Sequence, residues 1–536
     1  MAKPQTHRMK NLLLVLAVAA TAPALAQPSS AATKLQALLY QIDNMYVDSV
    51  DDNKLAEKAI VAMLAELDPH SVYIPKDDLE DVNEPLKGNF EGVGIQFNLV
   101  RDTIYVVDAI ASGPSERVGI RAGDRIVSVN DSTVAGTGLK NSDVIKLLRG
   151  PKGTRVNVGV VRPGEEAVLE FTITRDKIPI NSVEAAYMAA PGVGYIKVSR
   201  FGATTTKEFS DKLDDLKKQG MKDLVLDLQG NGGGYLRSAV EMADQFLGDR
   251  RLIVYTDGRT TPREDTYATK GGKFEKGRLV VMIDEGSASA SEIVTGAVQD
   301  WDRGVVVGRR SFGKGLVQRP VMLPDGSAVR LTVSRYYTPS GRCIQKSYAD
   351  GLEAYRHERQ DRLKEGELTN ADSIHFRDTV QYFTHNKRVV FGGGGIMPDI
   401  FVPIDTTASS TWFSQLVRKG ITNTTALNYV DRNRSALLKR YQGVGDFLDR
   451  FSVDAGLDAE LMKQATDAGI EPDSTGMARS KALVNLRLKA LVARDLWDTS
   501  AYWQVINADN PVDHSFKKAL EVILDLELQR TKLAER

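Results

Sequence analysis

Two residues with the chemistry of a nucleophile and a base lie close together in the sequence, Ser289 and Lys314. Ser289 follows a short apolar run, Leu279–Ile283, and precedes residues that are apolar at helical spacing. This pattern predicts a buried strand, a turn and a helix, with Ser289 near the first helical turn. Backbone N–H groups at that place have no partner within the helix, so they can stabilise a developing oxyanion.

The lysine lies between two flexible residues, Gly313 and Gly315, just before an apolar, strand-like run. A solvated lysine has a pKa near ~10.4 and is a poor base at neutral pH. Burial against apolar neighbours lowers that pKa and leaves a neutral amine that can take a proton from a serine hydroxyl. The two segments therefore predict a Ser–Lys pair, provided that the fold buries Lys314.

Each half of the pair also has a purely structural explanation. The segment Ser289-Ala290-Ser291-Glu292 has the spacing of a capping box, a device that only starts a helix. The segment Gly313-Lys314-Gly315 is also typical of a turn with a solvated lysine. The chemical interpretation depends on both segments occurring in one chain.

Together the two segments resemble the carboxy-terminal processing peptidases, also called tail-specific proteases. The family pattern has Gly-Ser-Ala-Ser-Ala-Ser-Glu and then Phe-Gly-Lys-Gly-x-Val-Gln, and this chain has both, at 286–292 and 312–318. The separation of 25 residues (314 − 289) matches the family when Ser289 is the nucleophile. The resemblance implies that Ser289 attacks the scissile carbonyl, that Lys314 is the general base and that Gln318 orients the lysine.

A glycine-rich loop, Gln229–Gly234, follows another strand-like run. Such a loop can cradle phosphate, but it lacks both a Gly-Lys-Ser/Thr ending and the spaced glycines of nucleotide-binding loops. The resemblance implies instead that the amides of Gly233 and Ala290 form an oxyanion site. The family usually has arginine where this chain has Gln229 and often proline where it has Gly232, so the amide donor stays open.

Residues 89–161 change to short strands and glycine turns, and they resemble a PDZ domain in the circular arrangement of bacterial proteases. The resemblance implies that Gly92, Val93, Gly94 and Ile95 form the loop whose amides hold a peptide carboxylate. The adjoining strand edge would add the peptide as an extra strand. A bare Gly-x-Gly is also a plain tight turn, and the later run Gly-Asp-Arg-Ile-Val-Ser-Val-Asn supports the domain assignment.

The N-terminus has the features of a secretory signal peptide. Basic residues precede an apolar run, Leu12–Ala20, and Ala24-Leu25-Ala26 is a small-x-small cleavage site. The alternative is an uncleaved anchor, but the run is shorter than the ~20 residues that a membrane span needs. We expect cleavage after Ala26, an exported or periplasmic protein, and no stable membrane span.

Composition excludes several other classes. The chain has 70 basic and 70 acidic residues in 536, so nothing favours nucleic acid as a partner. Its only cysteine, Cys343, cannot form a disulfide within the chain, and no motif histidine lies near it to make it a catalytic nucleophile. The histidines lack regular ligand spacing, and we therefore expect no metal and no cofactor.

These patterns predict a multidomain α/β chain whose peptidase core, by resemblance, is of the ClpP/crotonase-like kind. The expected parts are a signal peptide (1–26), an N-terminal helical region (27–88), a PDZ-like domain (89–175), the core (176–405, with a mostly helical insertion at 346–390) and a C-terminal helical domain (406–536). The last part could pack on the core, form a homo-oligomer or bind an adaptor.

The expected function is an exported serine endopeptidase. Its PDZ-like domain would bind the free C-terminus of a protein or peptide substrate, and the Ser–Lys dyad would cut nearby. One alternative is a catalytically inactive PDZ-containing scaffold that binds peptides, which the departure at Gln229 favours. A second alternative, a related fold acting on thioesters, lacks a recognisable nucleotide-binding motif.

Overall fold

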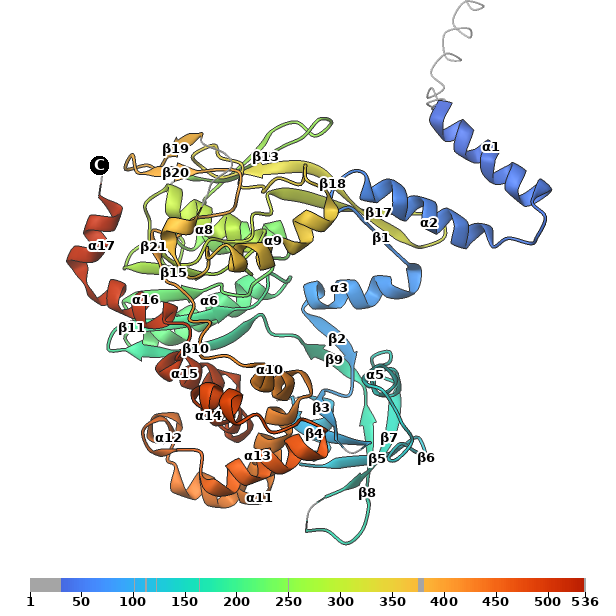
Figure 1. The fold of residues 1–536 in the computed structure, drawn as a ribbon, viewed down its shortest axis with the longest axis vertical. Coiled ribbons are helices and arrows are strands. Elements are labelled where there is room, and N and C mark those ends of the chain that lie inside the picture. Colours follow the sequence, from blue (N-terminus) through green and yellow to red (C-terminus); the bar gives the residue numbers. More distant parts are fainter. Residues whose placement is uncertain are drawn as a thin grey trace, which may run out of the picture. The chain divides into compact units, whose positions relative to one another are not determined.

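The computed structural model describes residues 30–100, 102–110, 113–121, 123–162, 164–248, 250–374 and 380–534 (Figure 1). The chain divides into two compact units, 1–67 and 68–536. The described part of the first unit consists of helices α1 (Ser30–Met45) and α2 (Asp52–Ala65). The expected signal peptide, residues 1–26, lies outside the described residues, among which no helix is long and apolar enough to cross a bilayer.

The second unit is built around a six-stranded sheet with the order β10-β11-β12-β15-β16-β21. The five strands from β11 to β21 run parallel, and β10 pairs antiparallel at one edge. The strands are β10 (Val183–Ala190), β11 (Val193–Val198), β12 (Asp223–Asp227), β15 (Leu279–Ile283), β16 (Val305–Gly308) and β21 (Ile400–Phe401).

Helices bury both faces of this sheet, which is why its central strands β15 and β16 carry no charged residue. Leu224 and Leu226 of β12 point to one face and pack in a cluster with residues of α6 (Thr205–Lys218), α7 (Leu236–Asp244) and α8 (Ala290–Asp300). Val225 points to the opposite face, where it packs with Val522 and Ile523. Those two residues belong to α16 (Ser515–Leu524), so the C-terminal helices complete the core.

A second sheet has the order β1-β18-β13-β14, with β17 also paired to β18. Its strands are β1 (Val72–Ile74), β13 (Leu252–Asp257), β14 (Glu264–Tyr267), β17 (Leu316–Met322) and β18 (Ala328–Tyr337). β17 begins two residues after Lys314, and β1 follows the turn that contains His70. Through β18, this sheet brings the lysine loop close to a turn that lies about 240 residues earlier in the chain.

The PDZ-like part is a separate sheet with its own core. Its order is β3-β4-β5-β7-β8, with β6 paired to β5, and its apolar residues form one cluster. A two-stranded ribbon of β2 and β9 carries the chain in and out of it. The elements are α3 (Leu79–Lys87), β2 (Asn89–Gly92), β3 (Ile95–Val100), β4 (Thr103–Ala109), α4 (Pro114–Arg117), β5 (Arg125–Val129), β6 (Ser132–Thr133), α5 (Asn141–Leu148), β7 (Arg155–Val161), β8 (Leu169–Thr174) and β9 (Asp176–Pro179).

The insertion at 346–390 contains less helix than the sequence indicates. It has α9 (Leu352–Lys364) and a short turn, η2 (Ala371–Ser373), but β19 (Gln381–Phe383) and β20 (Val389–Phe391) then form a hairpin. Aromatic and β-branched residues in these two short runs favour strands, whereas the charged residues between them made the segment look helical.

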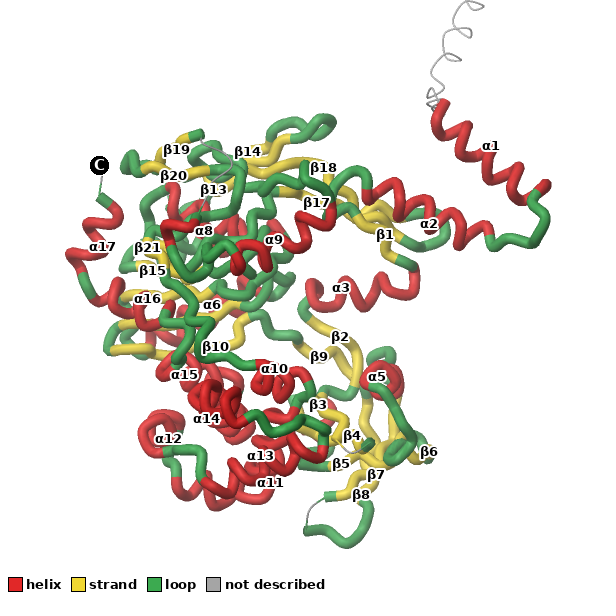
Figure 2. Tube along the Cα trace, viewed as in Figure 1, coloured by secondary structure: helices red, strands yellow, loops and turns green. Residues whose placement is uncertain are grey.

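The C-terminal part is helical, as expected. Helices α10 to α14 form one cluster around the long helix α14, and Figure 2 shows them as an all-helical region. The elements are α10 (Thr411–Arg418), α11 (Ile421–Arg440), α12 (Val444–Arg450), α13 (Ala455–Asp467), α14 (Ser474–Leu496), α15 (Thr499–Asp509), α16 (Ser515–Leu524) and α17 (Leu526–Leu533).

We predict that Ile523→Ala lowers the free energy of unfolding by ~2–5 kcal/mol, because it opens a cavity between α16 and the central sheet. Chemical denaturation monitored by circular dichroism measures the change. The adjacent Leu524 is 52% exposed, so Leu524→Ala should change stability by no more than about 0.5 kcal/mol. Equal effects of the two changes would contradict the packing of α16 on the sheet.

Candidate active site

The residues that the sequence paired line one cavity of about 420 Å³. Ser289, Lys314 and Gln318 all contribute to its wall. The remaining wall includes the glycine loop, Gly232–Gly234, and Arg330 of β18. Residues that lie far apart in the sequence therefore meet around a space large enough for part of a peptide.

Ser289 is the only serine of its motif that lines this cavity. The hydroxyl of Ser287 donates to the carbonyl of Leu228 at 2.9 Å, and that of Ser291 donates to the carbonyl of Asn231 at 2.8 Å; both side chains are fully buried. Ser289 precedes the first residue of α8 and has a φ of +56°, a conformation that costs a non-glycine residue ~1–3 kcal/mol. This strained turn holds Ser289 at the cavity while its neighbours anchor the loop.

A buried carboxylate, that of Glu292, joins the serine turn to the lysine loop. Its Oε2 accepts hydrogen bonds from the backbone N–H of Ser289 at 2.8 Å and from that of Lys314 at 2.9 Å. Its Oε1 accepts from the N–H of Gly313 at 2.7 Å and from the hydroxyl of Ser311 at 2.5 Å. Burial raises the pKa of Glu292, and these four donors oppose that rise.

The sequence indicated only a helix cap for Glu292, and the structure gives it a second role. The capping contact from Oε2 to the N–H of Ser289 is present. Oε2 also accepts from the N–H of Lys314, and Oε1 accepts from that of Gly313, so both oxygens bind the loop that carries the lysine. The sequence could have indicated this second role only through the presence of both motifs in one chain. Neither motif alone predicts that Glu292 contacts both loops.

The Lys314 side chain is half-buried, and its amine is held by a neighbour on β17. Its Nζ donates to Oε1 of Gln318 at 3.0 Å, and Nε2 of Gln318 donates to the backbone carbonyl of His70. Burial lowers the pKa of Lys314, the positive charge of Arg330 lowers it further, and the carboxylate of Glu292 opposes both. Partial burial therefore shifts the amine toward its neutral form, and Gln318 sets its direction.

Ser289 and Lys314 line the same cavity. Among the hydrogen bonds of the described residues, none joins the Ser289 hydroxyl to the Lys314 amine, which donates to Gln318 instead. Catalytic hydrogen bonds are often long in free enzymes and tighten when substrate binds. The shared cavity and the common anchor on Glu292 place the two groups in one site.

The glycine loop lies directly against the serine turn. A Cβ on Gly233, whose φ is +100°, would lie 2.8 Å from Cβ of Ser289 and 3.0 Å from the backbone nitrogen of Ala290, so a side chain does not fit there. The amide of Gly233, however, donates to Oδ1 of Asn231 at 2.9 Å. Asn231 is itself fixed, because its Nδ2 donates to the carbonyl of Val198 at 2.9 Å.

Gly233 and Ala290, which were expected to form the oxyanion site, are thus adjacent, but in the described part of the chain only one of their two amides is free to bind an oxyanion. The N–H of Ala290, at the start of α8, donates to no group among the described residues. The N–H of Gly233 is engaged by Asn231. The sequence indicated the loop, but the direction of one peptide plane depends on the Asn231 side chain, which sequence reasoning did not single out.

Gln229, where the resembled family usually has arginine, lies in a buried charge cluster. Its Nε2 is 3.5 Å from Oδ2 of Asp513. The same carboxylate accepts from Arg309 at 2.9 Å, and Arg309 also pairs with Glu285 at 2.8 Å. Gln229 and the buried Arg309, which follows β16, therefore contact the same carboxylate, that of Asp513 in the C-terminal part.

The expected peptide-binding loop lies between two strands of the PDZ-like part. Gly92 ends β2, and Ile95 begins β3. The carbonyl of Val93 accepts from the backbone and the hydroxyl of Ser115, and Gly94 has a φ of +76°. In the described sheet β3 pairs only with β4, so its other edge is available for an added strand.

Comparisons with known proteins agree with this architecture. Family models match the chain as "Peptidase family S41" over residues 192–353, as "PDZ domain" over 92–174, as "Activating protease CtpB N-terminal domain" over 10–78 and as a family of unknown function over 412–498. The carboxy-terminal processing protease CtpB of Bacillus subtilis (strain 168) is 37% identical over 349 residues, which is 65% of this chain and 70% of the relative. The chain belongs to peptidase family S41, the carboxy-terminal processing proteases.

Other members of this family show the same degree of similarity. A carboxy-terminal-processing protease of Bartonella bacilliformis is 36% identical over 310 residues, covering 57% of this chain and 70% of that protein. A solved structure described as photosystem II D1 C-terminal processing protease is 32% identical and covers 57% of this chain and 82% of its own, with a TM-score of 0.33. The sequence-based assignment to the family, and the PDZ domain, are confirmed, and Ser289 and Lys314 both lie within the S41 match.

We predict that Glu292→Gln lowers the turnover of this S41 peptidase by ten-fold or more, because misplacing the reacting groups by even ~1 Å can cost about 100-fold. The change keeps the size of the side chain but turns one acceptor into a donor that faces N–H groups, at a cost of ~1–3 kcal/mol in stability. Single-turnover cleavage and chemical denaturation measure the two effects. Glu241→Gln, on the exposed side of α7, is the matched control, and unchanged turnover in Glu292→Gln would refute the anchoring role.

Proposed function

We propose that this carboxy-terminal processing protease is an exported serine endopeptidase that uses a dyad of Ser289 and Lys314 to cut proteins near their C-termini. One observation carries the proposal: the single cavity-lining serine of the motif shares its cavity with a half-buried lysine whose pKa is lowered. The half-buried position of Lys314 supports this proposal over a fully solvated turn lysine.

The chemistry follows from these positions. The neutral Lys314 amine takes the proton of the Ser289 hydroxyl, and the oxygen attacks the scissile carbonyl to form a tetrahedral intermediate. The N–H of Ala290 and an amide of the glycine loop stabilise the oxyanion. The protonated lysine gives its proton to the leaving amine, and water hydrolyses the acyl-enzyme by the same route in reverse.

The PDZ domain supports recognition of a free C-terminus, since β3 presents an unpaired edge beside the loop from Gly92 to Ile95. The substrate class that we propose is therefore a protein or peptide with an extended tail. Export to the periplasm rests on the sequence of residues 1–26 alone, and amino-terminal sequencing of protein recovered from that compartment tests it, with Gln27 expected as the first residue.

A second candidate is a peptide-binding scaffold without turnover. Two observations favour it: the dyad residues are not hydrogen-bonded to each other, and the amide of Gly233 is engaged by Asn231. A serine-reactive covalent probe separates the two candidates, because an endopeptidase forms an adduct on Ser289 and a scaffold does not.

We predict that Ser289→Ala and Lys314→Ala each abolish cleavage of an unstructured protein with an apolar tail and leave folding intact. The readout is mass spectrometry of new C-termini after incubation with exported proteins, compared with the unmodified enzyme. Lys218→Ala, which removes an exposed lysine of α6, is the control and should cleave normally. Retained cleavage in Lys314→Ala would remove the assigned base.

We predict that the rate of Ser289 acylation rises with pH as Lys314 loses its proton, and that Arg330→Gln moves this rise to higher pH. Arg330 lowers the pKa of Lys314, so removing its charge lets that pKa increase and leaves less neutral amine at a given pH. Probe-labelling rates between pH 5 and 10 measure the profile. Arg319→Gln makes the same charge change at an exposed position of β17 and should leave the profile in place; a shift of equal size there would point to a general charge effect.

A further inference from the structure

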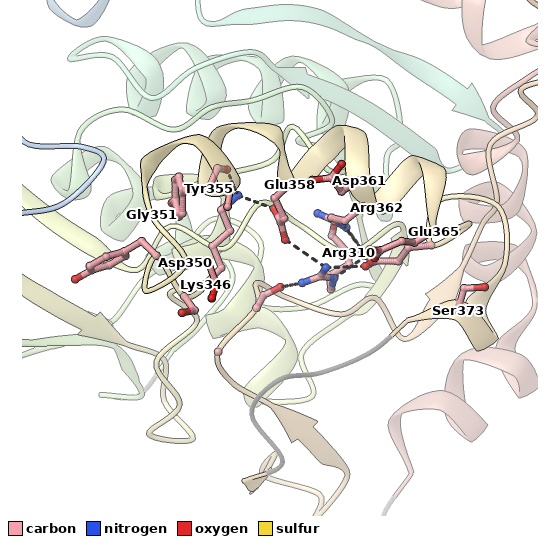
Figure 3. Close-up of a pocket in the computed structure, with 16 residues that line it drawn as sticks. Arg310, Lys346, Asp350, Gly351, Tyr355, Glu358, Asp361, Arg362, Glu365 and Ser373 are labelled. Atoms are coloured by element: carbon pink, nitrogen blue, oxygen red, sulfur yellow. Dashed lines mark hydrogen bonds and ion pairs between the residues drawn. The ribbon is translucent and has the colours of Figure 1, made fainter. Parts of the chain in front are cut away.

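A tyrosine of the insertion, Tyr355, contacts the catalytic machinery from outside the cavity. It lies on α9 and is 6% exposed, and its hydroxyl is 2.7 Å from Nε2 of His70. Figure 3 shows Tyr355 at the start of α9, next to Lys346. Neither residue lines the cavity that contains Ser289.

One arm of contacts runs from this hydroxyl to the lysine through His70. The backbone carbonyl of His70 accepts from Nε2 of Gln318, and Oε1 of Gln318 accepts from Nζ of Lys314. The turn that holds His70 is itself tied down, because Asp68 accepts from the backbone N–H of His70 at 2.8 Å. Moving the imidazole would move the carbonyl that holds Gln318.

A second arm runs through Gln345. Its Nε2 donates to the Tyr355 hydroxyl at 3.4 Å, and its Oε1 accepts from the backbone N–H of Gly315 at 2.8 Å. The Tyr355 oxygen therefore accepts from Gln345 and can donate its own proton to Nε2 of His70. The Tyr355 hydroxyl is thus linked through His70 to Gln318, which holds the Lys314 amine. It is also linked through Gln345 to Gly315, which follows Lys314 in the chain.

Both partners of the Tyr355–His70 bond are neutral near pH 7. Burial lowers the pKa of His70 to about 4. Burial also raises the pKa of Tyr355. The bond therefore joins a neutral hydroxyl to a neutral imidazole, and it brings no further charge to the lysine.

Ion pairs and aromatic contacts fix α9 so that the hydroxyl is held in place (Figure 3). Nζ of Lys346 lies 4.0 Å and 4.1 Å from the ring centroids of Phe312 and Tyr355 and pairs with Glu358 of α9 at 2.5 Å. Further along α9, Arg362 pairs with Glu367 at 2.7 Å, and the same carboxylate binds Arg310 at 2.7 Å. The helix is therefore clamped to the loop, residues 310–315, that carries the base.

We propose that Tyr355 is a positioning residue for the general base: its hydroxyl fixes His70 and Gln345, and through Gln318 it sets the direction of the Lys314 amine. The insertion is then part of the machinery of this peptidase. The proposal rests on the proposed function, since it needs Lys314 to act as the base.

Tyr355→Phe tests the proposal because it removes only the hydroxyl and keeps the ring that contacts Phe312 and Lys346. We expect kcat to fall about 3- to 10-fold with KM unchanged, because the bonds of the hydroxyl to His70 and Gln345 are both lost, and we expect a small decrease in the unfolding midpoint. Tyr348→Phe is the matched control, because Tyr348 packs against the Tyr355 ring but makes no hydrogen bond to His70 or Gln345 among the described residues. Equal behaviour of the two variants would overturn the proposal.

A double-mutant cycle distinguishes positioning from a general loss of structure. In a Gln318→Ala background, Tyr355→Phe should reduce the rate of Ser289 acylation less than it does in the unmodified enzyme, because the arm to the amine is already cut and only the arm through Gln345 remains. A His70→Phe background should give the same result. Multiplying effects in both backgrounds would overturn the proposal, whereas absence of Ser289 labelling in the unmodified enzyme would defeat the proposed function instead.

Discussion

The site depends on one buried carboxylate that accepts from two loops at once. Glu292 takes the backbone N–H groups of Ser289 and Lys314 on a single oxygen. A carboxylate that loses its water must have its lone pairs satisfied, so the two loops cannot separate without leaving a buried charge unpaired. The distance between nucleophile and base is therefore governed by the same interaction that keeps this charge inside the protein.

The rest of the fold can be understood as support for this contact. The parallel sheet ends its strands β12 and β15 beside one another, which brings the glycine loop against the serine turn. The second sheet contributes the lysine loop and, through β1, the turn at His70. Four segments, one of them about 240 residues before the lysine, are thereby held by backbone hydrogen bonds, the least sequence-dependent interaction available to the chain.

Much of this was predictable from local patterns, and the remainder was not for physical reasons. The strand, turn and helix around Ser289 follow from apolar spacing, and the PDZ and peptidase segments follow from their motifs. The role of Asn231 depends on the orientation of one peptide plane, which spacing does not encode. The bond between His70 and Tyr355 joins residues 285 apart, and the hairpin of β19 and β20 was hidden by its charged surroundings.

The placement of α16 has a consequence for shortened forms of the gene product. Every motif that carries the chemistry is translated before residue 350, yet one whole side of the central sheet is covered by a helix that begins at Ser515. A chain that stopped before Ser515 would keep the reactive groups but leave the valines on that face of the sheet without α16. Stable packing of the sheet that positions the site therefore depends on a helix about 200 residues beyond the lysine.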